Sequence, residues 1–109
     1  MVNEEKLENC LLDLGFVDSQ LGTHYIRRAV LAHRPGVGMT TEIYPAIAAA
    51  CDSTSSRVER AIRHATQSAW GRGSVFVQNK IFGHSISPDT GCPTNSELIA
   101  RLARVCNED

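Results

Sequence analysis

The sequence of 109 residues lacks any long apolar run and contains only six aromatic residues. No segment approaches the ~20 apolar residues that a membrane-spanning helix needs. The acidic, polar start MVNEEKLENC does not resemble a secretory signal. With so few aromatics, Leu, Ile, Val and Ala must build most of one modest core. We therefore expect a cytoplasmic chain of one domain with no membrane partner.

Signatures of metal binding and of catalysis are also missing. The four cysteines form no C-x-x-C motif, and together with the four histidines they give no zinc-binding spacing. No spacing of Asp, Glu, His or Ser suggests a catalytic triad or an acid/base pair. No carboxylate cluster indicates a nuclease metal site. We expect reduced thiols, no metal, no cofactor and no enzymatic activity.

Helical periodicity dominates the chain, and no segment shows sustained strand alternation. The sequence therefore predicts an all-α fold of about six helices. The expected helices lie near 3–14, 23–33, within part of 40–51, at 55–70, near 75–82 and from 94 to about 106. Pro45 lies in the first turn of the third helix or kinks it. TNSE begins the last helix as a capping box, with Thr94 as N-cap and Glu97 reaching back.

Positive charge is concentrated in the middle of a chain whose formal net charge is -1. Residues 27–72 hold seven arginines against three acids, a local balance of +4. In the expected helix at 55–70, one core-facing stripe comprises Val58, Ala61, Ile62, Ala65 and Ala69. The opposite side holds Arg60, Arg63 and Gln67, flanked by Arg57, Glu59 and His64. This segregation favours an anionic partner on one face.

The segment AIAAACDSTSSRVERAI has the spacing of a helix-turn-helix. Ala48 supplies the small residue where two helices touch, Cys51 is the apolar residue before the turn, and DST forms the turn. Asp52 stands where Gly is most usual, and Asp tolerates a left-handed backbone better than most residues. Thr54 can cap the second helix.

In a helix-turn-helix, the N-terminal half of the second helix enters the major groove. That half presents Arg57, Glu59 and Arg60 here. Arg donates two hydrogen bonds to guanine, and Glu accepts one from the cytosine amino group. We therefore expect base contacts from these three residues. Arg63 and His64, one turn later, suit phosphate.

Each of these residues also has a structural alternative. The arginines can form an ordinary solvated helix face. Glu59 can cap the helix through the S-x-x-E pattern that begins at Ser56. Trp70 is expected to pack at the helix end and not to stack on bases, and Arg27 and Arg28 are expected to be ordinary surface charges.

The run IYPAIAAACDSTSSRVERAIRHATQSAWGRG closely resembles the C-terminal DNA-binding domain of the master sporulation response regulators, the stage-zero A proteins of endospore-forming bacteria. PTNSELIA at 93–100 fits as well, as do Gly22, Tyr25 and the RRAV that follows, so the resemblance covers roughly residues 4–106. It implies a six-helix effector domain whose third and fourth helices form the helix-turn-helix. It also implies binding to tandem copies of a short box in double-stranded DNA, with activation or repression of promoters.

The resemblance implies two sets of DNA contacts. Base contacts would come from Arg57, Glu59 and Arg60. Phosphate contacts would come from Ser56, Arg63, His64, Thr94, Asn95 and Ser96. A helix N-terminus with hydroxyl groups, as at 94–96, also suits phosphate on physical grounds, and plain capping is the alternative role there.

The chain departs from the family in several places. The family carries a receiver domain ahead of this one, whereas we expect a single helix-turn-helix domain over 1–109 without a receiver. Cys92 replaces a common lysine, FGHS replaces a more aromatic stretch around residue 84, and the helix near 75–82 differs most. In the family that helix is linked to polymerase contact.

Double-stranded DNA is accordingly the expected partner, with RNA polymerase or a full-length response regulator as further candidates. We expect a monomer in solution that pairs on DNA. The alternative function is a protein-interaction module that partners or antagonises a full-length regulator through the 75–90 region.

Overall fold

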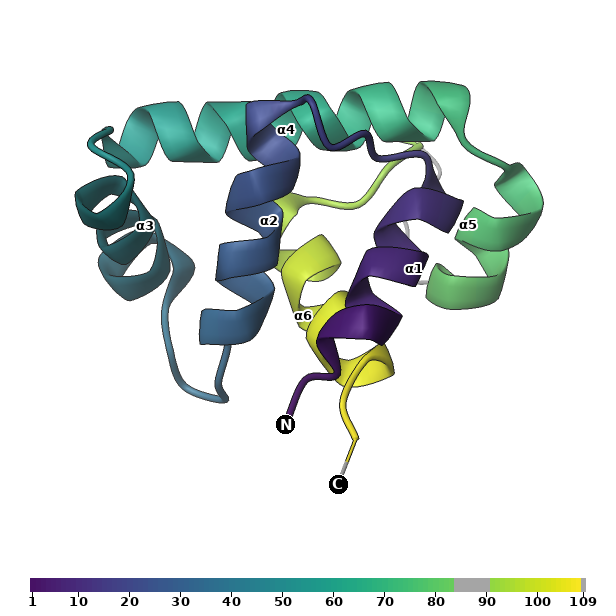
Figure 1. Ribbon diagram of the computed structural model, residues 1–109, viewed down its shortest axis with the longest axis horizontal. Coiled ribbons are helices and arrows are strands. Elements are labelled where there is room, and N and C mark those ends of the chain that lie inside the picture. Colours follow the sequence, from purple (N-terminus) through teal and green to yellow (C-terminus); the bar gives the residue numbers. More distant parts are fainter. Residues whose placement is uncertain (84–90, 109) are drawn as a thin grey trace.

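The computed structural model describes residues 1–83 and 91–108, and the regular elements in those residues are helical (Figure 1). The expected all-α class with six α-helices is confirmed. The elements are α1 (Glu4–Leu14), α2 (Leu21–Ala32), the π-helical turn η1 (Met39–Ile43), α3 (Tyr44–Ala50), α4 (Ser55–Arg72), α5 (Val75–Phe82) and α6 (Asn95–Val105). Part of the FGHS stretch and of the 75–90 region lies outside the described residues. In the described part of the chain, none of the helices combines the length and apolarity needed to cross a bilayer.

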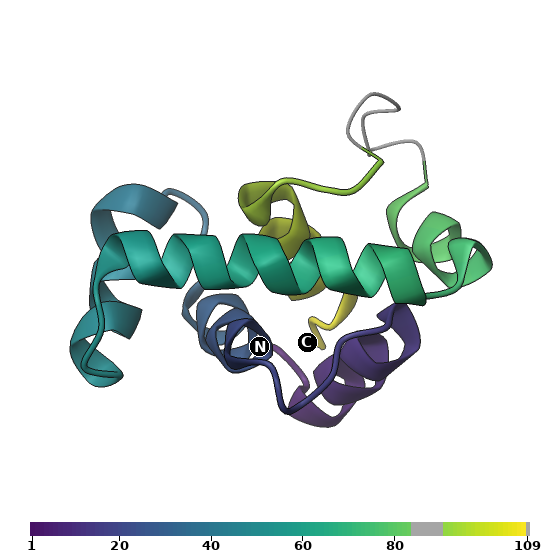
Figure 2. The same cartoon turned by 90° about the horizontal axis from the view of Figure 1, so that it is seen from above.

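The long helix α4 organises the fold. It runs across the whole domain, with α3 at one end, α5 at the other and α2 packed against its middle (Figure 1). Figure 2 shows α6 beginning on one side of α4, with α1 and α2 on the other. The side of α4 that faces away from α1 and α2 is therefore bounded by α3 and by the start of α6.

The apolar stripes predicted from periodicity form much of the core, which α3, α5 and α6 complete. Their buried members on α1, α2 and α4 are Leu7, Leu11, Leu14, Tyr25, Ile26, Ala29, Val30, Val58, Ile62, Ala65 and Ala69. Ala61 is half-buried at the edge of the same stripe. Trp70 packs its ring against those of Phe16 and Phe82, at centroid distances of 6.4 and 5.3 Å, which confirms its expected packing role.

The connection between α3 and α4 has the local features expected of a tight interhelical turn. Pro45 lies in the first turn of α3 and does not kink it, and Ala48 is buried. Asp52 adopts the left-handed backbone, with φ of 53°. Thr54 caps α4 by accepting a 3.2 Å hydrogen bond from the backbone N–H of Arg57. Four residues thus separate two helices that pack against each other.

The two ends of the chain lie side by side, at the edge of the domain away from α4 (Figure 1). Val2 and Asn107 form an isolated antiparallel bridge. The terminal ammonium of Met1 donates to Oδ1 of Asn107 at 2.6 Å, and the Glu108 N–H donates to the Met1 carbonyl at 2.8 Å. Chain start and chain end therefore hold each other in place.

Arg27 differs from the ordinary surface charge that we expected. Its guanidinium on α2 forms ion pairs with Glu8 on α1 and with Asp18 in the loop between the two helices. The hydrogen bond to Glu8 is the main cause that raises the pKa of Arg27. This residue thus links the first two helices and is not an unpaired surface charge.

Candidate nucleic-acid interface

The N-terminal half of α4 is held in one rotational setting by its buried residues. Val58 and Ile62 are fully buried against the core. Successive side chains on a helix are rotated by about 100°, so burial of these two residues turns the charged side chains of the same segment outward. The side chains that it exposes are Ser56, Arg57, Arg60, Arg63 and His64.

Arg57 and Arg60 are exposed and have no carboxylate partner among the described residues. Arg63 differs, because its guanidinium forms a 2.7 Å ion pair with the Glu59 carboxylate one turn earlier. These two side chains are 49% and 36% exposed, and exposed pairs at this spacing contribute only about 0.3–0.5 kcal/mol. A phosphate could therefore replace Glu59 as the partner of Arg63 at little cost.

The capping alternative for Glu59 is wrong. The N-cap of α4 is Thr54, and the helix begins at Ser55, so Ser56 is already inside the first turn. The carboxylate of Glu59 pairs with Arg63. It remains on the surface next to Arg60, where its other lone pairs stay accessible.

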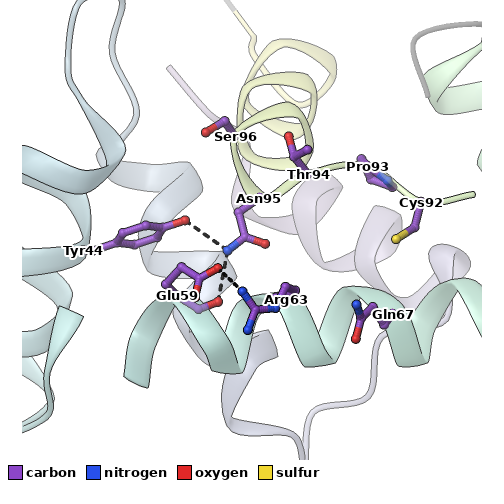
Figure 3. A pocket seen from close by; sticks show the side chains of 9 residues that line it. All are labelled: Tyr44, Glu59, Arg63, Gln67, Cys92, Pro93, Thr94, Asn95 and Ser96. Atoms are coloured by element: carbon purple, nitrogen blue, oxygen red, sulfur yellow. Dashed lines mark hydrogen bonds and ion pairs between the residues drawn. The ribbon is translucent and has the colours of Figure 1, made fainter. Parts of the chain in front are cut away.

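The start of α6 is brought against this face of α4 (Figure 3). The Asn95 carboxamide nitrogen donates one hydrogen bond to the Tyr44 hydroxyl and another to the Glu59 backbone carbonyl, each at 3.0 Å. Thr94 and Ser96, on either side of Asn95, are exposed. Residues far apart in the sequence thus form one surface.

The expected capping box at the start of α6 is confirmed. The Thr94 hydroxyl accepts from the Glu97 backbone N–H at 3.2 Å, and the Glu97 carboxylate accepts from the Thr94 N–H at 2.9 Å. The first backbone N–H groups of any helix have no acceptor within it. The backbone N–H groups of Asn95 and Ser96 are among these first groups of α6, so an anion in front of them would be stabilised.

Two hollows lie between these elements. The larger has a volume of about 540 Å³ and is lined by Tyr44, Glu59, Arg63, Gln67, Cys92, Pro93, Thr94, Asn95 and Ser96 (Figure 3). The smaller, about 300 Å³, is lined by Thr40, Tyr44, Ser55, Ser56, Glu59, Arg60 and Arg63. Of the predicted contact residues, only Arg57 and His64 line neither hollow. The others line one or both of these neighbouring hollows, which share Tyr44, Glu59 and Arg63.

Tyr44 is the site residue to which the sequence reasoning gave no role. It is buried, with 6% of its surface exposed, and its hydroxyl accepts the bond from Asn95. Burial is the main cause that raises its pKa. A buried tyrosine hydroxyl needs a hydrogen-bond partner, and this requirement could have indicated that Tyr44 bonds to another side chain of the site.

Cys92 lines the larger hollow. Its thiol pKa is raised by burial and, to a smaller extent, by the Glu97 carboxylate.

Within residues 1–83 and 91–108, no group of three or more His, Cys, Asp or Glu side chains is placed to hold a metal ion.

Comparison with known proteins identifies the domain that carries this face. The family model described as Sporulation initiation factor Spo0A C terminal matches residues 7–105, nearly the whole chain. It is a family of regulatory DNA-binding domains and not of enzymes. The resemblance read from the sequence is thereby confirmed, and the chain belongs to the C-terminal domain family of sporulation initiation factor Spo0A.

Proposed function

We propose that this chain is a single-domain, sequence-specific regulator of transcription that binds double-stranded DNA through α3 and α4 as a helix-turn-helix. One observation carries the proposal. Arg57 and Arg60 are exposed, without a carboxylate partner among the described residues, on the N-terminal half of a helix capped by Thr54. In a helix-turn-helix this half enters the major groove, where such side chains reach base edges.

We assign base contacts to Arg57, Glu59 and Arg60. The two guanidinium groups suit guanine, because each can donate two parallel hydrogen bonds to O6 and N7. The Glu59 carboxylate suits the cytosine amino group. Its ion pair with Arg63 supports this role, because the pair restrains the carboxylate on the outer face of α4 before DNA arrives.

Phosphate contacts complete the proposed interface. We assign them to Ser56, Arg63, His64, Thr94 and Ser96, and to the backbone N–H of Asn95. Arg63 and His64 lie one turn beyond the base-reading residues on the exposed face. At α6, the capped N-terminus offers hydroxyl groups and unbonded backbone N–H groups, which is favourable for a phosphate anion.

Selection of preferred sites from a random duplex pool, followed by binding titrations, tests the proposal. The selected duplex should bind more tightly than random DNA, and both affinities should fall steeply with salt. Arg57→Ala should lower affinity for the selected duplex by about 1–3 kcal/mol and relax preference at one position. Arg63→Ala should weaken both duplexes alike.

Arg104→Ala is a matched control, because Arg104 is exposed near the chain ends, away from α4. It should change both affinities little. Equal affinity of the wild-type chain for every duplex would overturn the proposal, and so would unchanged binding by both α4 variants.

A second candidate function rests on α5. Val75 and Phe76, consecutive at its start, are 67% and 76% exposed, so two large apolar side chains are available to a partner there. A protein-interaction module would present such residues to RNA polymerase or to a full-length response regulator. Pull-down with and without nuclease discriminates, because direct protein association survives removal of DNA and is lost in Phe76→Ser.

We further propose a cytoplasmic chain that is a monomer in solution and pairs on DNA. Tandem boxes would hold two copies side by side, as the family resemblance implies. Analytical ultracentrifugation should give a monomer alone and two protomers per duplex carrying two boxes. A dimer without DNA would contradict this arrangement.

A further inference from the structure

Asn95 connects three elements of the DNA-facing surface through one side chain. It begins α6, its carboxamide donates to the Tyr44 hydroxyl at the start of α3, and it donates to the Glu59 carbonyl on α4. Figure 3 shows the carboxamide directed into the space between Tyr44 and α4, away from the hydroxyl groups of its neighbours. The side chain is half-buried there.

The attachment point on α4 matters for base reading. A carbonyl oxygen has two lone pairs, so the Glu59 carbonyl can accept from Asn95 and still take part in the helix ladder. Glu59 and its neighbour Arg60 are proposed base-reading residues. Asn95 therefore holds α4 at the place where the position of the helix decides which base edges are reached.

The carboxamide has no donor left for a phosphate. Its nitrogen carries two hydrogens, and both are directed to protein acceptors, at 3.0 Å each. Asn95 retains its backbone N–H at the start of α6 for an anion, as do its neighbours. The side chain and the backbone of this residue thus have separate tasks.

We propose that Asn95 is a positioning residue for sequence readout: through Tyr44 and Glu59 it fixes the phosphate-binding start of α6 relative to the base-reading half of α4. This inference rests on the proposed DNA-binding function and deepens it. Specific binding requires base contacts and phosphate contacts to be made at the same time. Nonspecific binding needs only charge near the backbone. Loss of the Asn95 bonds should therefore reduce discrimination more than affinity.

The experiment compares the full chain with Asn95→Ala, Tyr44→Phe and the double variant on the selected duplex and on a random duplex. Asn95→Ala should lower the ratio of the two affinities about tenfold, the size expected from two lost hydrogen bonds of ordinary strength. Its affinity for random DNA should stay within about twofold, since the phosphate-facing charges are unchanged. Tyr44→Phe keeps the buried ring and removes one acceptor, so it should give a smaller loss.

The double variant separates positioning from general destabilisation. Because the Tyr44 hydroxyl acts through Asn95, Tyr44→Phe should cause no further loss of discrimination in the Asn95→Ala background. Asn9→Ala makes the same chemical change on an exposed position of α1 and should leave the ratio unaltered. Circular dichroism at the titration temperature shows that each variant is folded. If Asn95→Ala does not fold, the loss of discrimination in Tyr44→Phe decides whether the inference holds.

Three results would overturn the inference. One is an unchanged ratio in folded Asn95→Ala and in Tyr44→Phe while the wild-type chain discriminates. Another is an equal fall on both duplexes, which would mean that the side chain contacts phosphate directly. The third is simple additivity in the double variant. If the wild-type chain itself shows no preference, the proposed function fails first, and the two failures are thereby distinguishable.

Discussion

Gly22 on α2 lies directly against the backbone carbonyl of Ala61 on α4. A Cβ at residue 22 would overlap that carbonyl oxygen and would also approach the Ala65 side chain to 2.7 Å. Only a residue without a side chain lets the two helix backbones approach this closely. The packing of α2 against the middle of α4 depends on this contact, and so does the rotational setting of the face of α4 that we propose binds DNA.

Gly22→Ala should therefore destabilise the domain, although alanine favours a helix. Overpacking of a tight contact costs about 1–3 kcal/mol, which exceeds the gain in helix propensity. The free energy of unfolding from urea titration measures this loss. Gly71→Ala is the matched control, because a Cβ there, near the end of α4, meets nothing within 4 Å. It should leave stability unchanged or increase it, and a stable Gly22→Ala would show that α2 can shift.

Removing the N-cap of α4 should loosen the N-terminal half of the helix, to which we assign base contacts. Thr54→Ala leaves the Arg57 N–H without its 3.2 Å acceptor and should cost about 1 kcal/mol of unfolding free energy. Thr54→Ser keeps the hydroxyl and should lie close to the wild type. Amide hydrogen exchange at 55–58 provides the local measurement. Equal exchange in both variants would contradict the capping role.

Glu59→Gln should change two properties in opposite directions. The carboxylate only accepts hydrogen bonds, whereas the amide of Gln both accepts and donates, so it no longer selects the cytosine amino group. The preference for cytosine should therefore fall by about 1–3 kcal/mol at one base pair. The same change releases Arg63 from its ion pair and removes a negative charge, so binding to random DNA should tighten. Anisotropy titrations on both duplexes measure the two effects. Weaker binding to random DNA would contradict them.

Cys106 should make stability depend on alkaline pH. Burial, and then the adjacent Cys10 thiol at 3.8 Å, raise the pKa of Cys106 from 9.0 to about 12. A folded-state pKa above the unfolded value stabilises the fold fully below about pH 9. That stabilisation is lost as pH rises from about 9 towards 12.

Urea titrations of the wild-type chain between pH 8 and about 10.5 should show this fall, and Cys106→Ala should show a shallower one. Cys51→Ala, at the half-buried end of α3, should keep the wild-type slope. Identical slopes in all three proteins would mean that Cys106 does not contribute.

Much of the fold follows from local signals. The apolar stripes of α1, α2 and α4, the Thr94 capping box and the left-handed Asp52 all depend on residues within a turn or two of each other. The helix-turn-helix spacing and the side-chain chemistry predicted DNA contacts on α4, and the family resemblance added Ser56 and supported those at the start of α6. Each of those residues was read from its own helix, which is why the separate stretches at 56–64 and 94–96 could be named without knowing how close they lie.

The features that were missed depend on long-range packing. The sequence predicted that α2 begins near residue 23, whereas it begins at Leu21. Glycine usually disfavours a helix, but Gly22 is required inside this one because the Ala61 carbonyl of α4 packs directly against it. The turn η1 has no periodic pattern, and the Glu42 carboxylate stabilises it by accepting from the Gly38 N–H at 2.8 Å. The contact between Asn95 and Tyr44 spans 51 positions, so no local pattern contains it.

The bridge between Val2 and Asn107 makes the two ends neighbours on the side that faces away from α4. A few glycines and serines could join them into a circular chain without stretching any helix. New ends could then be opened in another exposed loop. A fluorophore or surface tether attached beside Val2 or Asn107 would likewise lie away from the proposed DNA-binding face of α4, so that single-molecule measurements could record individual binding events on a duplex.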